Sequence, residues 1–422
     1  MSEARTAANT AARSLVVLAA ALTTTTALTA TAVAPAHADP GPAGPTTVRA
    51  SVDRNGGQLQ APSYGQDLSA GFDARPAFTT AGPVWEGDTN GLTDVYFGDS
   101  VISSGYPRGM GDGPSRGGAP CVNGRMTAFV SEATNITSTP APDDRPTVYV
   151  RNRAVGKVSR ASQSFEGTPF AWAARPEVSD DCMWVSFTAA LEGPDGTARQ
   201  PRVYRYRIYD GTVRLVSEPS ARADHSSISH DGRYVAYESG GNVHVRDLET
   251  GTLEKASTAR DGGPADGRSS GASLSGDGRH VAFDSTASNL TAGDRNGGVN
   301  VFVRDLDAGT TRLVRGETRR ARTYDAALAA DGTHLAYVSA ARGKGGAGRV
   351  PAVFLRELAT GETQLISADV GGGRNDLPAR RPSVNDDGSV VAFDSASPDL
   401  VTGDTNRLSD VFLRTVKDGQ SD

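Results

Sequence analysis

The chain has 422 residues, a formal net charge of −6 and a sequence pI of about 5.6. This mild acidity argues against a nucleic-acid partner, which would favour a basic surface. Beyond the amino-terminal leader, no segment of the sequence is apolar enough to cross a membrane. The length would suggest two or three domains, unless the chain is built from repeats.

Residues 1–38 have the features of a secretory signal peptide. Arg5 and Arg13 precede the apolar run SLVVLAAAL, and small residues at the Ala36-His37-Ala38 stretch suit a signal peptidase. Threonines interrupt the run, which is therefore too short to span a bilayer. We expect cleavage after Ala38, a secreted and extracellular protein, and a flexible lead-in over residues 39–45.

One sequence motif recurs through the rest of the chain. It predicts a strand, a tight turn, and a second strand that ends in an aromatic residue, which we call the anchor. Clear copies are SISHDGRYVAY, SLSGDGRHVAF, ALAADGTHLAY and SVNDDGSVVAF, and three weaker copies precede them. The seven anchors are Phe78, Phe129, Phe187, Tyr237, Phe283, Tyr337 and Phe393. They recur about every fifty residues, which is the period of a propeller blade.

Each copy continues with two more strand-like segments, such as VFVRDL and TTRLVR, separated by a glycine-containing turn. We therefore predict an all-β fold, a single seven-bladed β-propeller over residues 46–416, followed by a tail at 417–422. The last copy has no room for its fourth strand, whereas residues 46–57 resemble the fourth-strand segment at 362–373. We expect the N-terminal strand to complete the last blade and close the ring.

The repeating unit resembles a known family. S-x-D-G-R-x-V-A-F, followed by V-F-V-R-D-L and a T-G turn, is similar to the WD-like repeat of TolB-type β-propellers in the style of secreted actinobacterial proteins. The resemblance covers residues 46–416 and is strongest over 227–414. Members of this group include periplasmic scaffolds, and similar propellers cap peptidases or form the body of polysaccharide lyases. The resemblance therefore implies a fold and leaves the function open.

A motif rich in Asp and Asn lies between the predicted second and third strands of blades 1, 5 and 7. Its oxygen-bearing residues align as Asp88, Asn90 and Asp94; Asp294, Asn296 and Asn300; and Asp404, Asn406 and Asp410. Their spacing resembles part of a calcium-binding loop, although two ligands of an EF-hand are missing. Alternatively, these side chains accept hydrogen bonds from nearby backbone and form Asx-turns. Calcium is the one possible cofactor, and turn chemistry is the simpler interpretation.

A second group of candidates surrounds the channel of the predicted propeller. The first strand of each blade should line the channel, so residues just before it should ring one mouth. Counting twelve residues back from the anchors gives Gly117, Arg175, His225, Gly271, Asp325 and Arg381, with Arg116 and Arg380 adjacent. We take Arg175, His225, Asp325, Arg380 and Arg381 as candidates for binding a carboxylate or phosphate. The alternative is a solvated polar rim without a ligand.

The two cysteines, Cys121 and Cys182, fall near the first turns of neighbouring blades 2 and 3. In an exported chain we expect them to form a disulfide. Their distances from the anchors differ, eight residues against five, which is the one argument against pairing.

No catalytic signature such as G-x-S-x-G or H-E-x-x-H interrupts the repeats. We therefore expect a non-catalytic binding scaffold, monomeric and not inserted into a membrane, that binds a protein, or a cell-wall or polysaccharide ligand, at a channel mouth. One alternative is a lyase-like carbohydrate enzyme that uses His225 with Arg175 and Arg381. Another is a structural module stabilised by calcium.

Overall fold

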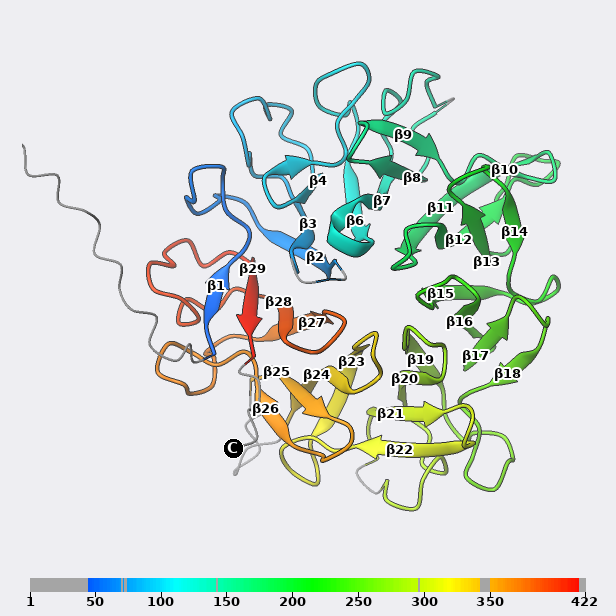
Figure 1. Cartoon of the computed structure of the whole chain (residues 1–422), viewed down its shortest axis with the longest axis vertical. Coiled ribbons are helices and arrows are strands. Elements are labelled where there is room, and N and C mark those ends of the chain that lie inside the picture. The colour runs from blue at the N-terminus through cyan, green and yellow to red at the C-terminus, as the bar shows by residue number, and fades with distance from the viewer. Residues whose placement is uncertain are drawn as a thin grey trace, which may run out of the picture. The chain divides into compact units, whose positions relative to one another are not determined.

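Seven antiparallel sheets surround a common centre in the computed structural model of the chain (Figure 1). The structure describes residues 45–69, 71, 74–141, 143–294, 297–341 and 350–416. The predicted signal peptide, residues 39–44 of the lead-in and the tail at 417–422 lie outside these ranges. Within them, we find no helix with the length and hydrophobicity that a membrane span requires. The predicted all-β, seven-bladed propeller is confirmed.

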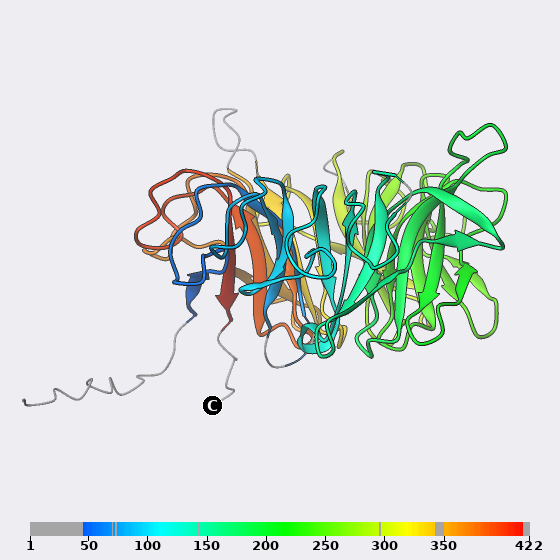
Figure 2. The ribbon, with the colours of Figure 1, turned by 90° about the horizontal axis from the view of Figure 1, so that it is seen from above.

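Within a blade, the strands follow chain order from the centre of the ring to its rim. The first strands are β2 (Ser63–Leu68), β6 (Ser115–Pro120), β11 (Thr168–Val178), β15 (Ala223–Ile228), β19 (Ser269–Leu274), β23 (Arg322–Leu328) and β27 (Ala379–Val384). The second strands are β3 (Pro76–Thr80), β7 (Met126–Ser131), β12 (Trp184–Leu191), β16 (Tyr234–Ser239), β20 (His280–Ser285), β24 (His334–Ala340) and β28 (Val390–Ser395). Figure 2 shows the ring edge-on: the strands run across its thickness, so the turns between them lie on its two faces.

The outer half of each blade has the same order. The third strands are β4 (Asp94–Phe97), β8 (Thr147–Asn152), β13 (Arg202–Arg207), β17 (Asn242–Asp247), β21 (Asn300–Asp305), β25 (Ala352–Glu357) and β29 (Asp410–Thr415). The fourth strands of blades 1 to 6 are β5 (Ser100–Val101), β9 (Lys157–Arg160), β14 (Val213–Leu215), β18 (Leu253–Lys255), β22 (Thr310–Val314) and β26 (Thr363–Leu365). Blade 3 gains a short extra strand, β10 (Ser164–Phe165), which pairs with β11 through a tight turn at Glu166 and Gly167.

The N-terminal strand supplies the fourth strand of blade 7. β1 (Thr47–Arg49) pairs antiparallel with β29, and Val48 lies opposite Leu413. The backbone N–H of Ala50 extends this pairing by donating to the carbonyl of Val411 at 2.8 Å. The predicted closure is confirmed: β1 gives blade 7 its fourth strand and joins the two ends of the chain within one sheet.

The seven aromatic anchors form the repeating unit of the core. Each lies on the second strand, is fully buried, and stacks on a ring directly opposite it on the third strand. Ring centroids are 5.7–6.0 Å apart and the planes meet at 23–26° in all seven pairs, of which Phe283 with Phe302 is one. Such cross-strand pairs explain why an aromatic residue recurs once per blade.

A disulfide joins blades 2 and 3. Cys121 follows β6 and Cys182 lies in the turn after β11, and their Cα atoms are 5.3 Å apart. A short 3-10 turn at Val122–Gly124 lengthens the first hairpin of blade 2. This longer turn accommodates the different offsets of the two cysteines from their anchors.

Candidate functional site

A β-bulge interrupts the first strand of every blade. The pairing of the first and second strands shifts register at this point in all seven sheets. One residue in each bulge has a positive φ, between 42° and 65°. These residues, which we call the bulge ring, are Gly65, Gly117, Arg175, His225, Gly271, Asp325 and Arg381.

Four members of the bulge ring are not glycine. Arg175, His225, Asp325 and Arg381 adopt a left-handed backbone that costs a non-glycine residue about 1–2 kcal/mol. All four were predicted as ligand-binding candidates, but they lie within the first strands rather than just before them. The bulge, and not the end of the strand, therefore determines where these side chains point.

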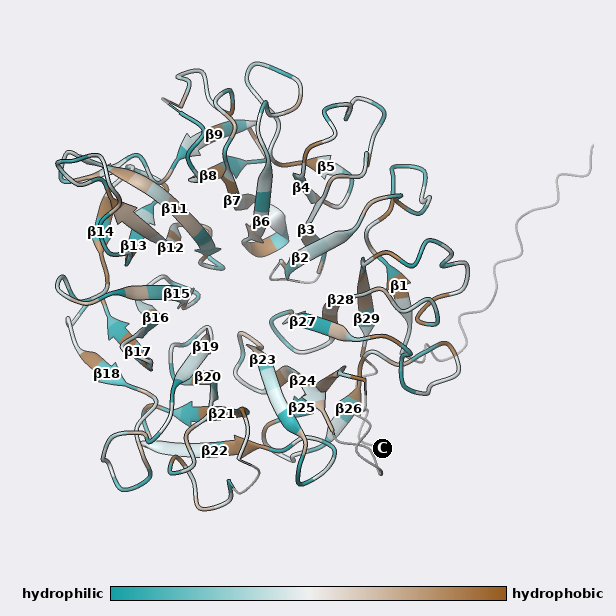
Figure 3. Ribbon diagram, turned by 180° about the vertical axis from the view of Figure 1, so that it is seen from behind, coloured by the Kyte–Doolittle hydropathy of each residue, from teal (hydrophilic) through white to brown (hydrophobic). Residues whose placement is uncertain are grey.

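The first strands of all seven blades enclose a central cavity of about 740 Å³. At the level of the bulge ring its lining includes Arg116, Arg175, His225 and Arg381. The remaining candidates, Asp325 and Arg380, are exposed side chains outside that lining. Figure 3 shows hydrophilic segments on β6, β15 and β27 around the centre of the ring. The structure thus brings three of the five predicted residues to one polar cavity.

Arg381 is held by a carboxylate that the sequence analysis missed. Asp394, on β28, accepts two hydrogen bonds from the Arg381 guanidinium, at 2.8 and 2.9 Å. The Asp394 side chain is almost fully buried, whereas that of Arg381 is half exposed to the channel. This bidentate pair fixes the arginine against its own blade while leaving its outer edge accessible.

Two further carboxylates occupy the same position in blades 4 and 5. Glu238 accepts a hydrogen bond from the backbone of Gly271 at 2.7 Å and lies 3.5 Å from Nδ1 of His225. Asp284 accepts one from the backbone of Asp325 at 3.0 Å, and burial raises its pKa to about 7. All three acids directly follow an aromatic anchor, so the dipeptides Y-E and F-D were the available sequence signal.

Arg175 has weaker counter-charges than Arg381. Its guanidinium contacts the ring of His225, and its Nε lies 3.8 Å from a carboxylate oxygen of Asp224. Burial and the neighbouring Arg175 lower the pKa of His225, so this histidine is neutral at neutral pH. The Arg175 side chain is about half exposed and available to an anion.

The channel is acidic where the turns between first and second strands lie. We call Asp67, Glu177, Asp180 and Asp386 the acid end; all four line the cavity. Burial raises the pKa of Asp67 to about 6, although the Ser383 hydroxyl donates to it at 2.9 Å. Burial and then Asp386 raise the pKa of Asp180 to about 6. Sequence reasoning missed this group because the strand register was needed to align it.

In blade 7 two of the predicted calcium ligands, Asp404 and Asp410, form ion pairs with the guanidinium group of an arginine of the same chain. Arg49 of β1 lies 3.2 Å from Asp404 and 3.0 Å from Asp410, and both carboxylates are fully buried. The amide of Gln58 also donates to Asp404 at 2.8 Å. The side-chain oxygen of Asn406 accepts a hydrogen bond of 2.9 Å from the backbone N–H of Leu408, and this contact forms an Asx-turn.

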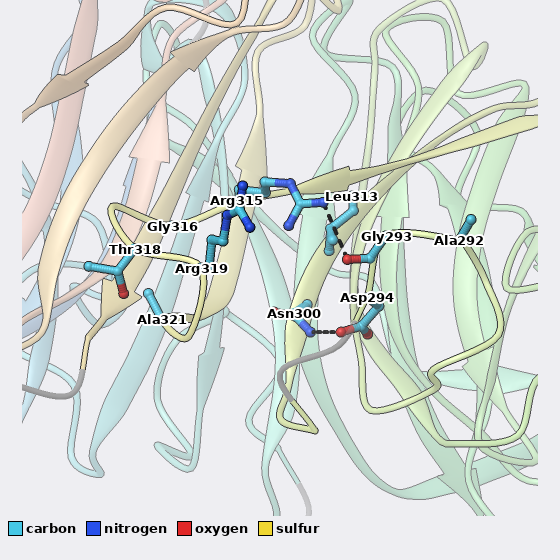
Figure 4. A pocket seen from close by; sticks show the side chains of 10 residues that line it. All are labelled: Ala292, Gly293, Asp294, Asn300, Leu313, Arg315, Gly316, Thr318, Arg319 and Ala321. Atoms are coloured by element: carbon cyan, nitrogen blue, oxygen red, sulfur yellow. Dashed lines mark hydrogen bonds between the residues drawn. The ribbon is translucent and has the colours of Figure 1, made fainter.

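In blade 5 an amide replaces one carboxylate. Asn300 donates to Asp294 at 3.0 Å beside a cavity of about 480 Å³, and Arg315 donates to the carbonyl of Gly293 (Figure 4). The third predicted ligand of this loop, Asn296, lies outside the described residues.

The loop of blade 1 keeps two acids and gains no basic partner among the described residues. Asp94 accepts hydrogen bonds from Ser103 at 2.6 Å and from Asn90 at 3.1 Å, and Asp88 accepts one from the hydroxyl of Tyr96. Burial raises the pKa of Asp94 to about 6. Throughout the described ranges, no three His, Cys, Asp or Glu side chains are grouped to hold a metal ion. Calcium binding by these loops stays a prediction.

The sequence matches no protein-family model and no curated protein. The structure is similar to an oligogalacturonate lyase in complex with manganese, with a TM-score of 0.56 and 12% identity over 89% of this chain and 97% of the lyase. A puromycin-hydrolyzing peptidase of Mycobacterium tuberculosis aligns with a TM-score of 0.53 and 14% identity, over 84% of this chain and 52% of the peptidase. TolB of Acinetobacter baumannii aligns with a TM-score of 0.41 and 15% identity, over 83% and 79%. The seven sheets make the protein a β-propeller, TolB and related propellers are among its structural neighbours, and the names of the lyase and the peptidase describe different activities.

Proposed function

We propose that this protein is a secreted, non-catalytic scaffold that binds an anionic group of an extracellular polymer in its central channel. The observation that carries this proposal is the left-handed backbone of Arg175 and Arg381. Blades 1, 2 and 5 have glycine at the same position, where the bulge forms without this strain. An arginine there lowers stability, so its side chain has a role that the fold alone does not require.

The arrangement around the ring suits an anion. Between Arg381 of blade 7 and Arg175 of blade 3 lie Gly65 and Gly117, which place no side chains in the channel. A Cβ atom on Gly117 would meet no atom within 4 Å, so the space beside it is open. Arg116, next to Gly117, lines the same part of the cavity. Any of these guanidinium groups can bind a carboxylate or phosphate through paired hydrogen bonds. The cavity volume lies in the range typical of small-ligand sites.

Binding of an acidic glycan and its neutral ester tests this function. We expect oligogalacturonate to bind in isothermal titration at about pH 7.5, and its methyl ester to bind at least on the order of tenfold more weakly. Arg175→Gln should weaken binding of the acid, whereas Arg214→Gln, an exposed arginine on β14, should not. Equal binding of acid and ester, or unchanged binding by the Arg175 variant, would rule the proposal out.

A lyase-like enzyme is the second candidate, and one contact favours it. The neutral imidazole of His225 lies against the guanidinium of Arg175. A base beside a cation can remove the proton next to a carboxylate while the cation stabilises the developing negative charge. The glycosidic C–O bond on the adjacent carbon then breaks, so that a C=C bond forms and the released oxygen takes up a proton to become a hydroxyl. The similarity to an oligogalacturonate lyase supplies a substrate to try. Formation of an unsaturated product, followed by ultraviolet absorbance and lost in His225→Gln, would make the protein an enzyme.

A further inference from the structure

One carboxylate in the channel, that of Glu177, has no partner among the described residues. Glu177 lies on β11, lines the central cavity, and has neither a hydrogen-bond donor nor a basic side chain as a partner within the described structure. Burial, and then the charges of Asp67 and Asp180, raise the pKa of Glu177 well above its usual range. An ionised carboxylate withdrawn from water is costly unless a positive group compensates it.

The other three members of the acid end have partners, which makes Glu177 distinct. Asp67 accepts the Ser383 hydroxyl, Asp180 lies 3.4 Å from Nδ1 of His230, and Asp386 accepts the backbone N–H of Gly71 at 3.1 Å. None of these donors is an arginine or lysine. The acid end therefore carries more negative charge than the protein neutralises, and it faces a cavity that a ligand can enter.

The same strand carries the least compensated arginine of the bulge ring. Arg175 and Glu177 are separated by Pro176 on β11, and all three line the cavity. Two residues of extended chain span at most about 7 Å, so the Cα atoms of Arg175 and Glu177 lie within that distance, and the bulge between them orients the two side chains. A positive and a negative group thus lie close together on one wall of the cavity.

We infer that the channel accepts a dipolar ligand, with an anionic group against Arg175 and an ammonium group against Glu177. This inference rests on the proposed function, which supplies the anionic half. The positive half is an organic ammonium and not a metal ion, because no three acidic, His or Cys side chains of the described residues are grouped around one point. Amino acids, peptides and amino sugars that bear a carboxylate have the required chemistry.

A series of ω-amino acids tests both the charges and their spacing. The probes are glycine, γ-aminobutyrate, δ-aminovalerate and ε-aminocaproate, with valerate and pentylamine as single-charge controls, all measured by isothermal titration at constant ionic strength. We expect affinity to peak at δ-aminovalerate or ε-aminocaproate, because their charges can reach groups on residues whose Cα atoms are up to about 7 Å apart, whereas those of glycine cannot. We expect δ-aminovalerate to bind on the order of tenfold tighter than valerate.

Two variants and a control assign the two ends. Glu177→Gln keeps the shape of the side chain and should abolish the advantage of δ-aminovalerate over valerate while leaving valerate binding intact. Arg175→Gln should weaken both. Glu362→Gln, the same chemical change at an exposed turn of blade 6, should change neither.

The outcomes separate this inference from the proposed function. Valerate binding that needs Arg175, without any gain from the amino group, would overturn the dipolar ligand and leave the anion-binding scaffold standing. No binding of valerate or of any amino acid in the series would overturn both. A gain from the amino group that persists in Glu177→Gln would also overturn the inference, because the ammonium would then lie elsewhere.

Discussion

Fully or partly buried carboxylates occur in two regions of this propeller, and the protein treats them differently. In the blade 7 loop, Asp404 and Asp410 are fully buried but share the guanidinium of Arg49, which comes from the strand that closes the ring. At the acid end of the channel, Glu177 faces the cavity without a hydrogen-bond or ion-pair partner in the described structure. The first region is complete within the folded chain, and the second is not.

We propose that this difference separates residues with a structural role from residues of the same type that serve the proposed binding site. A buried acid that the chain neutralises contributes to folding, because removing either partner leaves an uncompensated charge. A buried acid that the chain leaves unneutralised lowers stability in the absence of a ligand. The comparison makes opposite predictions for substitutions in the two regions.

The largest expected effect is the loss of Arg49. Arg49→Met should lower the free energy of unfolding by about 3–5 kcal/mol at neutral pH, because Asp404 and Asp410 would remain buried without a cation. Urea denaturation of the mature protein measures the change. Arg54→Met is the matched control: its pair with Asp99 is exposed on both sides, so the loss should stay below about 1 kcal/mol.

A small effect of Arg49→Met would show that the two acids are neutralised in another way. Adding Asp404→Asn and Asp410→Asn to the variant should then restore nothing. If the pairing is as described, these two changes should recover part of the lost stability, because they remove the unpaired charges.

Glu177→Gln should have the opposite sign. The folded-state pKa of Glu177 is raised by burial and by Asp67 and Asp180, so its contribution to stability is complete below the unfolded-state pKa and is lost as the pH rises through the folded-state pKa. The variant should therefore be more stable than the wild type at about pH 8, by about 1–3 kcal/mol. At about pH 4 the two should unfold alike. Destabilisation at the higher pH would indicate a hidden partner for Glu177.

Asp94→Asn is expected to have a smaller stabilising effect. Burial raises the pKa of Asp94 from 3.8 to about 6, so wild-type stability falls as the pH rises through this interval. Blade 5 already has Asn300 at the equivalent position, bonded to Asp294. At about pH 8 we expect the substitution to raise the free energy of unfolding by about 1–2 kcal/mol. The benefit of removing the buried charge is partly offset, because the amide accepts one hydrogen bond fewer than the carboxylate.

Thermal unfolding with calcium and with excess chelator completes this test. A calcium-dependent rise in melting temperature that Asp94→Asn removes would assign the metal to the loop of blade 1. A rise that persists in the variant would place calcium in another loop.

The repeats made the fold predictable because one physical requirement recurs seven times. Each aromatic anchor stacks on the ring opposite it, and the short D-G turn fixes the register of the first hairpin. The N-terminal closure was predictable because the last blade lacked a strand. The extra strand of blade 3 was not, because it depends on a turn at Glu166 and Gly167 that no other blade contains.

The site was predictable only where it follows the repeat. Counting back from the anchors found Arg175, His225 and Arg381, because the bulge residue lies twelve residues before the anchor in blades 2 to 7; in blade 1 the offset is thirteen. The count could not show that these residues have a positive φ, since that depends on the register shift. It also missed Glu177, which we propose as a ligand-binding residue because it has no partner among the described residues. A missing partner in three dimensions leaves no sequence pattern.

The smallest expected effect on stability tests whether the non-glycine side chains of the bulge ring serve ligand binding and not folding. Arg175→Gly should remove the backbone strain of a left-handed non-glycine residue, but it also makes the unfolded chain more flexible. We therefore expect the free energy of unfolding to rise by only about 0.5 kcal/mol. Gly117→Ala is the reciprocal change. The added Cβ would meet no atom within 4 Å, so the only cost is the backbone strain at φ 65°. We expect the free energy of unfolding to fall by about 1 kcal/mol. Binding of the acidic probe should be lost in the first variant and kept in the second. If Arg175→Gly instead destabilised the protein by more than about 1 kcal/mol, the arginine would be a structural residue, because a side chain retained for a ligand should not be needed by the empty fold.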